Sequence, residues 1–215
     1  MADFVDYLSR RWDHVLELTI EHAAVTVLSV GIAMVIGVGL GLATYRTQLP
    51  RDVVLAITAI FLTIPSLALF GLFIQILGLG WRSVVVALVM YSLLPIVRNT
   101  VVGLREVDPA IVESAQGMGM GRLRRLVRIE LPLAWPVIMT GVRVATLIVV
   151  GIAAIGAYIN GPGLGNDIFR ALSNPGSAQA LNITLGGILG VIVLAIVFDL
   201  FYVLVTRLTM SKGLR

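Results

Sequence analysis

The sequence predicts an all-α integral membrane protein with about five transmembrane helices and an amphipathic helix at its N-terminus. Hydrophobic residues make up 58% of the chain, charged residues make up 13%, and the mean hydropathy is +0.99. A soluble domain carries roughly 25% charged residues, so this composition fits the bilayer as solvent. The apolar runs are unbroken rather than alternating, and a helix spans a membrane with about 20 apolar residues. We therefore expect one helical membrane domain over residues 1–215.

Residues 1–20 are predicted to form an amphipathic helix at the membrane interface. Apolar side chains recur there at a spacing of three to four residues, and charged side chains fill the other side. The segment lacks the basic start of a signal peptide. His14 and His22 sit at or before the first span, where His22 is expected to be an interfacial side chain and neither is expected to bind a metal.

Five membrane spans are expected after this helix. Their predicted ranges are Ala23–Tyr45, Val53–Leu77, Trp81–Val97, Pro136–Tyr158 and Thr184–Thr206. Pro65 is expected to bend the second span, because proline removes a helical hydrogen bond. Small residues in the first span, Gly31, Gly37 and Gly41, are expected to allow close packing against a neighbouring helix.

The orientation follows from the basic residues in the connections. Eleven lie on one side of the predicted membrane: Arg46, Arg51, Arg98, Arg105, Arg122, Arg124, Arg125, Arg128, Arg207, Lys212 and Arg215. Four lie on the other side: Arg10, Arg11, Arg82 and Arg170. Since cytoplasmic loops carry the excess of basic residues, we expect the plasma membrane with the N-terminus outside and the C-terminus cytoplasmic. The two long connections are then a cytoplasmic loop at 98–135 and an extracytoplasmic loop at 159–183.

The 98–135 loop carries helix signals interrupted by glycines. Asp108-Pro109 is typical of a helix start, and Gly117, Gly119 and Gly121 are expected to end that helix. The segment "RLRRLVRIEL" then predicts a second helix, with one apolar side: Leu123, Leu126, Val127 and Leu131. Such a short helix on a stem can transmit a push from another protein. A solvated amphipathic linker is the alternative that loop chemistry alone leaves open.

The residues of this loop resemble the motif E-A-A-x3-G-x9-I-x-L-P of ABC importer permeases with the smaller type I fold. Serine replaces the first alanine, and every spacing fits. The resemblance implies a type I ABC importer transmembrane fold, in which this segment is the coupling helix seated in the ATPase subunit. The residues expected to couple are Glu113, Ser114, Ala115, Gly117, Gly119, Ile129, Leu131 and Pro132.

Four further stretches narrow the resemblance to osmoprotectant permeases, which move glycine betaine, choline, carnitine or proline betaine. They are "IPSLALFGLF", "LLPIVRNTVVGL", "DPAIVESAQGMGM" and "ELPLAWPVIMTGVRVAT". The stretch "INGPGLG" (159–165) departs from the usual wording of the family. An importer of the same fold for methionine, a sulfonate or another small solute therefore remains an alternative, and a non-transport membrane scaffold remains another.

The expected partners follow from chemistry that the chain lacks. No G-x4-G-K-[ST] motif is present, and the one lysine, Lys212, follows every span. We therefore expect no cofactor on this chain and no enzymatic activity of its own, with ATP and magnesium held by partner ATPase subunits. Few aromatic residues lie outside to cage a quaternary amine, so an extracytoplasmic substrate-binding protein is expected, as is a second permease copy or a paralogous permease. The high pI reflects arginines near headgroups rather than nucleic-acid binding.

Two ionisable residues lie inside predicted spans. Arg143 is seven residues from the cytoplasmic start of span four, and Asp199 is seven residues from the cytoplasmic end of span five. At about 1.5 Å per residue both sit roughly 10 Å deep, so we expect them to pair. The alternative is that each snorkels to the interface. Asn160 and Tyr91 are weaker candidates for the pathway, because a lone polar residue in a span more often bonds a neighbouring helix.

Overall fold

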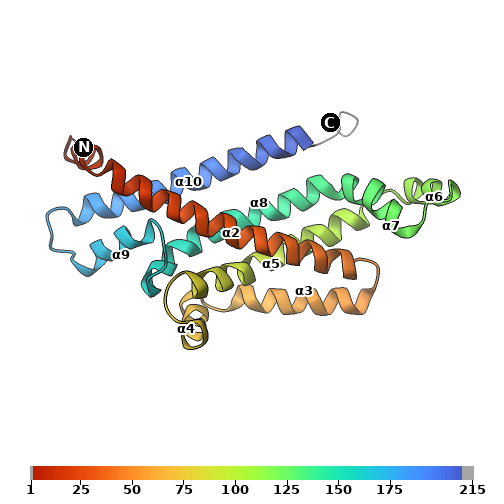
Figure 1. Ribbon diagram of the computed structural model, residues 1–215, viewed down its shortest axis with the longest axis horizontal. Helices are drawn as coiled ribbons and strands as arrows, with labels where there is room; N and C mark the ends of the chain where they lie inside the picture. The colour runs from red at the N-terminus through yellow and green to blue at the C-terminus, as the bar shows by residue number, and fades with distance from the viewer. Residues whose placement is uncertain (1, 210–215) are drawn as a thin grey trace.

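The computed structural model describes residues 2–209, with side chains from Phe4 onward, and all its regular elements in that range are helical (Figure 1). The helices are α1 (Ala2–Arg10), α2 (Trp12–Thr44), α3 (Gln48–Thr63), α4 (Ser66–Leu77), α5 (Trp81–Arg105), α6 (Pro109–Gly117), α7 (Arg122–Arg125), α8 (Leu131–Ile155), α9 (Gly165–Ser173) and α10 (Ala180–Thr209), with a π turn at Leu126–Glu130 and a 3-10 turn at Gly156–Ile159. Lys212 and Arg215, which were counted for the orientation, lie outside the described residues.

The chain crosses the bundle five times, as predicted. Four of the described helices are long and apolar enough to span a membrane, namely α2, α5, α10 and the helical stretch that contains α8. Helices α2 and α5 run in the same direction, because Gly37 lies against Ile96 and Gly41 lies against Thr100. The segment between them, α3 and α4, must therefore cross back. We call the end where α2 and α5 finish and α6 and α7 lie the arginine-rich end, and the end with α1 and α9 the opposite end (Figure 1).

The second crossing is broken rather than bent. Helices α3 and α4 meet at 98°, and Figure 1 shows α4 lying across the bundle. Ile64, which precedes Pro65, is extended at φ −68° and ψ 130°, as expected because a following proline disfavours helix. The Tyr91 hydroxyl donates a 2.6 Å hydrogen bond to the Ile64 carbonyl. Tyr91 is 2% exposed, so it satisfies the backbone at the break instead of lining an open passage.

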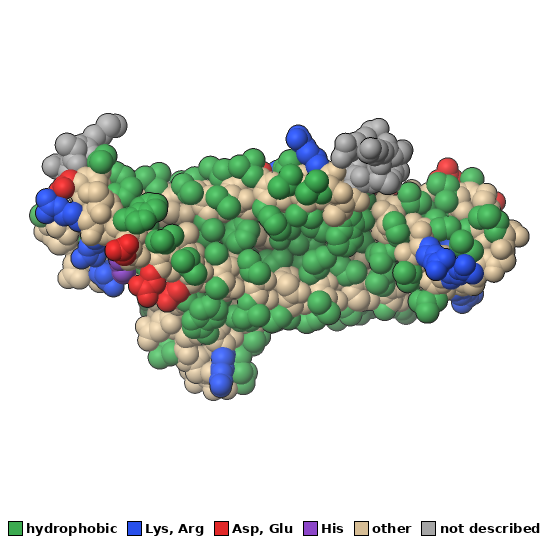
Figure 2. Space-filling view, turned by 45° about the horizontal axis from the view of Figure 1, so that its top comes forward, with side chains coloured by type: hydrophobic (Ala, Val, Ile, Leu, Met, Phe, Trp, Pro, Cys, Tyr) green, Lys and Arg blue, Asp and Glu red, His purple; other side chains and the backbone are tan. Residues whose placement is uncertain are grey.

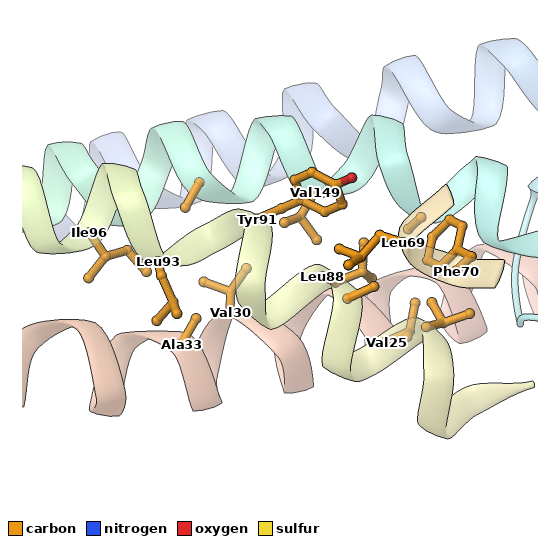
Figure 3. Packing of buried hydrophobic residues seen from close by; sticks show 14 of the residues in the cluster. Val25, Val30, Ala33, Leu69, Phe70, Leu88, Tyr91, Leu93, Ile96 and Val149 are labelled. Carbon is orange, nitrogen blue, oxygen red and sulfur yellow. The ribbon is translucent and has the colours of Figure 1, made fainter. Parts of the chain in front are cut away.

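The main core lies where α5 packs between α2 and α8. Buried side chains of α2, α4, α5 and α8 fill this space, including Val30, Leu88, Ile96 and Val149 (Figure 3). The crosswise α4 contributes Phe70, which is fully buried. By contrast, only 6% of the apolar window of α10 is buried within this chain, so α10 lies at the periphery of the bundle.

Several predicted boundaries differ from the structure because the helices continue past their apolar stretches. Helix α2 starts at Trp12, so the second half of the expected interfacial segment 1–20 belongs to the first long helix. Helix α5 runs to Arg105, and the helical stretch that leads into α8 begins at Arg122, with the short helix α6 between them. The connection predicted at 98–135 is therefore a shorter loop at 106–121. The 159–183 connection contains the short helix α9.

Glycine packing gives a first test of the fold. A Cβ added at Gly41 would lie 2.5 Å from Thr100 Cγ2, whereas one at Gly31 would meet nothing within 4 Å. We expect Gly41→Ala to lower the free energy of unfolding by about 1–3 kcal/mol, because it overpacks the contact between α2 and α5. The control, Gly31→Ala, should leave the free energy of unfolding unchanged or raise it slightly. Thermal unfolding of the purified protein in detergent measures both, and equal midpoints for the two variants would contradict this packing.

Candidate functional site

The 106–121 loop presents α6 through well-formed caps at both of its ends. The Asp108 carboxylate accepts a 2.8 Å hydrogen bond from the Ala110 amide, with Pro109 in the first turn. At the other end, the Met120 amide bonds the Ala115 carbonyl and the Gly119 amide bonds the Gln116 carbonyl. This pairing is a Schellman motif with Gly119 in the left-handed conformation at φ +77°. The predicted helix and glycine turn are both confirmed.

The loop exposes apolar side chains outside the bundle. Of the predicted motif residues on α6, Glu113 and Ser114 are exposed, while Ala115 is 1% exposed and packs inward. Large apolar side chains beside them face outward: Ile111, Met118 and Leu123. Figure 2 shows basic side chains beside hydrophobic ones at this end of the molecule. This combination of exposed apolar and charged groups at the arginine-rich end is typical of a surface that another protein covers.

A hollow of about 480 Å³ separates α6 from the bundle. Its walls come from α6, from the end of α5 and from the buried polar cluster described below, including Val112, Gln116, Leu104 and Arg105. Helix α6 thus lies over an open space. It is joined to the rest of the chain by residues 106–108 and 118–130, which we call its two stems.

A buried ion-pair cluster fastens one of these stems to α2. The Glu130 carboxylate is 3% exposed and accepts hydrogen bonds from Arg125 Nε at 2.8 Å, Tyr45 Oη at 2.7 Å and Arg46 Nη2 at 3.0 Å. Arg125 is itself 6% exposed. We call Tyr45, Arg46, Arg125 and Glu130 the stem cluster. Because each guanidinium and the carboxylate have partners, the buried charges are compensated.

The remaining predicted motif residues, Ile129, Leu131 and Pro132, lie in a π turn and in the first residues of α8. The Leu131 amide bonds the carbonyl of Leu126, five residues back, and Pro132 has no amide to offer the Arg128 carbonyl. Ile129 and Leu131 are partly buried and Pro132 is exposed. The π turn therefore joins α7 to α8 directly, in place of an ordinary helix start.

The predicted apolar side of the second loop helix is confirmed for two residues and wrong for two. Leu126 and Leu131 pack against the core, but Leu123 is 74% exposed and Val127 is 54% exposed. Arg125 is buried instead, by its bond to Glu130, because the π turn interrupts the expected period of 3.6 residues. Glu130 was not among the predicted residues, although a lone acid in an apolar context was a usable signal.

Arg143 of α8 and Asp199 of α10 form the predicted pair. Arg143 Nε lies 2.6 Å from Asp199 Oδ1, and Arg143 Nη2 lies 2.7 Å from Oδ2. The two planar groups therefore meet as a fork with parallel hydrogen bonds. One helical turn away, the Tyr202 hydroxyl and Thr146 Oγ1 are 2.9 Å apart. These polar contacts hold α10 to the bundle, because little of its apolar surface is buried against the other helices.

This pair can be tested with an exchange of charges. We expect Asp199→Ala to lower the thermal midpoint by several degrees, because the Arg143 guanidinium then loses the carboxylate with which it pairs. The double exchange Arg143→Asp/Asp199→Arg should recover at least about half of that loss, since it restores opposite charges. Thermal unfolding in detergent checks this. The pairing would be contradicted if the double variant lost as much in its midpoint as the two single variants lose together.

At the opposite end, the connection after α8 is tied to α2. Asp167 of α9 is 1% exposed and lies 3.0 Å from His14 Nε2, and the Gly163 amide donates to Glu21 at 3.1 Å. Burial, followed by the negative charge of Asp167, raises the pKa of the Tyr7 phenol. The α9 segment is therefore anchored to the N-terminal helices by polar contacts.

Two predictions at this end need correction. Asn160 is exposed in a turn with φ 58° after the 3-10 turn, so it is not a polar residue within a span. The turn needs a left-handed residue, which asparagine tolerates. His22 is fully buried, with Nε2 3.0 Å from the Val150 carbonyl, and is therefore not an interfacial side chain. The helix containing His22 starts at Trp12, eleven residues before the predicted start of the first span, and this side chain lies inside the bundle.

Comparison with known proteins decides the family. The family model described as "Binding-protein-dependent transport system inner membrane component" matches residues 33–210. The chain belongs to this family. The permease is accordingly a multi-pass membrane component of a binding-protein-dependent transport system. Its bundle of five crossings with a short exposed loop helix has the type I ABC importer fold predicted from the loop motif.

Similar proteins and structures agree with this assignment. The permease is 35% identical over 215 residues to the choline transport system permease protein OpuBB of Bacillus subtilis, covering 100% of this chain and 97% of that one. It is 38% identical to the osmoprotectant import permease protein OsmW of Salmonella typhimurium, covering 99% and 100%. Its fold resembles an inward-facing MetNI methionine ABC transporter chain with a TM-score of 0.80 and 21% identity, covering 91% of this chain and 96% of that chain.

Proposed function

We propose that this chain is the transmembrane subunit of an ATP-driven importer for quaternary-amine osmoprotectants such as glycine betaine, choline, carnitine or proline betaine. Full-length similarity to permeases named for choline and for glycine betaine, carnitine and choline supports this solute class. The chain would supply the passage and leave ATP hydrolysis to its partners. Methionine and sulfonates are the competing solutes within the same fold.

The structural observation that carries the proposal is α6, held by its caps over the 480 Å³ hollow with its apolar side chains outward. In this proposal α6 seats in a cleft of an ATPase subunit that holds ATP and magnesium. Closure of the ATPase pair then displaces α6, and the stem cluster passes the displacement to α2 and α8. Ser114 lies on the exposed surface that would touch the ATPase, whereas Glu113, although exposed, lines the hollow behind α6.

The remaining partners follow from this arrangement. The excess of arginines near α6 supports a cytoplasmic location for that end, with the N-terminus outside. An extracytoplasmic binding protein would deliver solute at the opposite end, near α9. A second permease, either another copy of this chain or a paralogue, would complete the passage along the side where α10 lies exposed.

Transport by the reconstituted complex tests the proposal. The permease, its ATPase and its binding protein are placed in proteoliposomes, with ATP inside and labelled glycine betaine, choline, carnitine or methionine outside. ATP-dependent uptake of a quaternary amine, and no uptake of methionine, is the expected result. Uptake of methionine alone would overturn the solute class, and loss of ATPase association on deleting α6 would separately support the docking role.

A further inference from the structure

A basic groove lies between α3 and α5 at the arginine-rich end. Its volume is about 500 Å³, and its lining comprises three arginines, one glutamate and three apolar residues: Arg51, Arg98, Arg105, Glu106, Leu55, Val101 and Val102. The lining therefore combines guanidinium groups with an apolar floor. We propose that this groove binds the headgroup of an anionic phospholipid.

Two of the three arginines in the groove, Arg98 and Arg105, lack partners among the described residues that would neutralise them. Arg51 bonds only its neighbour Asp52, at 2.9 Å, and no ion pair or hydrogen bond engages the side chains of Arg98 and Arg105 within residues 2–209. A guanidinium near apolar surface is costly unless it finds an anion or water. The groove thus offers net positive charge that nothing else in the described chain satisfies.

The spacing of the arginines fits a lipid better than a free ion. Arg98 and Arg105 are two turns apart on one face of α5, so Arg98 lies about 10 Å deeper. Val101 and Val102 lie between them, and Val102 is 39% exposed. A lipid phosphate can meet the outer guanidinium groups while its glycerol and acyl region lie along this apolar floor. Basic pockets between spans on the cytoplasmic side are typical sites for anionic headgroups.

The surroundings of the groove also fit lipid. Helix α3 has one buried residue, Thr58, and exposes large apolar side chains along its length, including Val53, Ile57 and Ile60. A second copy of this chain would bring mostly positive charge to this end, because its acids there (Asp52, Glu106, Asp108, Glu113 and Glu130) are outnumbered by its arginines, and Asp52 and Glu130 are already paired with arginines. Charge complementarity therefore favours a phospholipid over another copy as the occupant.

Lipid binding to the intact transporter complex tests the proposal. Native mass spectrometry in detergent would measure retention of added phosphatidylglycerol and of phosphatidylcholine. We expect Arg98→Gln or Arg105→Gln to weaken phosphatidylglycerol binding about fivefold each. Arg82→Gln is the matched control, because it removes one exposed arginine from the other end of the same helix. Equal binding by Arg98→Gln and Arg82→Gln, or equal retention of the two lipids, would overturn the proposal.

Two further measurements distinguish the other occupants and do not depend on these variants folding. If millimolar inorganic phosphate displaces the lipid from the unaltered protein, the groove is a simple anion site and the lipid proposal fails. The chain contains no cysteine, so Val102→Cys introduces a single thiol. Oxidative cross-linking of two copies through this thiol would show that protein covers the groove, whereas cross-linking to a thiol-reactive phosphatidylglycerol is the expected result. None of these outcomes depends on the transported solute.

Discussion

Replacing Glu130 with alanine is expected to lower the free energy of unfolding by about 3–5 kcal/mol, because it leaves the buried Arg125 guanidinium without a counter-charge. The same change also removes the hydrogen-bond partner of Tyr45 and of Arg46, so the stem that follows α6 is no longer bonded to the end of α2. Thermal or denaturant unfolding of the purified protein measures the loss. Glu130→Gln should lower the free energy of unfolding by less, since the amide keeps an oxygen that accepts hydrogen bonds.

Glu113→Ala is the matched control for this stability measurement. Glu113 is an exposed glutamate of the same loop, and a surface substitution there should change the free energy of unfolding by less than about 0.5 kcal/mol. If Glu130→Ala and Glu113→Ala unfold at the same midpoint, the stem cluster does not stabilise the fold in the way described. Restoring the midpoint of Glu130→Ala by a second change, Arg125→Leu, would indicate that the unpaired charge causes the loss.

Replacing Gly119 with alanine is expected to reduce ATP-dependent uptake by about five- to tenfold. The φ of +77° at this position costs a residue with a Cβ about 1–2 kcal/mol, and about 1.4 kcal/mol corresponds to a tenfold shift in population. A Cβ at Gly119 would meet nothing within 4 Å. The penalty therefore arises from the backbone and should act on the position of α6 rather than on the bundle.

Gly121→Ala is the control for this prediction. Gly121 precedes α7, and a Cβ there also meets nothing within 4 Å, but its φ of −64° suits alanine. Uptake by Gly121→Ala should remain near that of the unaltered protein in the same proteoliposomes. Equal loss of uptake in both variants would point to crowding at the ATPase surface instead of the Schellman turn.

The fold and the loop could be predicted because their signals are local. Unbroken apolar runs mark the crossings, and Asp108, Pro109 and Gly119 mark the ends of α6 through capping chemistry that involves neighbours in sequence. The pair of Arg143 and Asp199 was also predictable, since two charges at one depth in apolar helices have few other partners. These features depend on pattern and depth alone.

The stem cluster was not predictable in the same way. Tyr45 and Glu130 are 85 positions apart and meet only because α2 and α8 run antiparallel. The π turn before α8 adds a residue to the helical repeat, and this shifts the side chains that follow away from the expected face. The 98° break at Pro65 was underestimated as a bend, because proline alone does not fix the angle between two helices.

The exposed face of α10 has a different meaning in a bilayer than it would have in water. Hydrocarbon tails solvate leucine and valine as well as a protein neighbour does, so apolar exposure alone gives no drive toward association. The forked pair of Arg143 and Asp199 is different, because its side chains remain 40% and 32% exposed. Lipid tails cannot solvate these charges. The part of α8 and α10 that carries this pair must therefore face water or protein, and this limits how the subunit can be turned in the membrane.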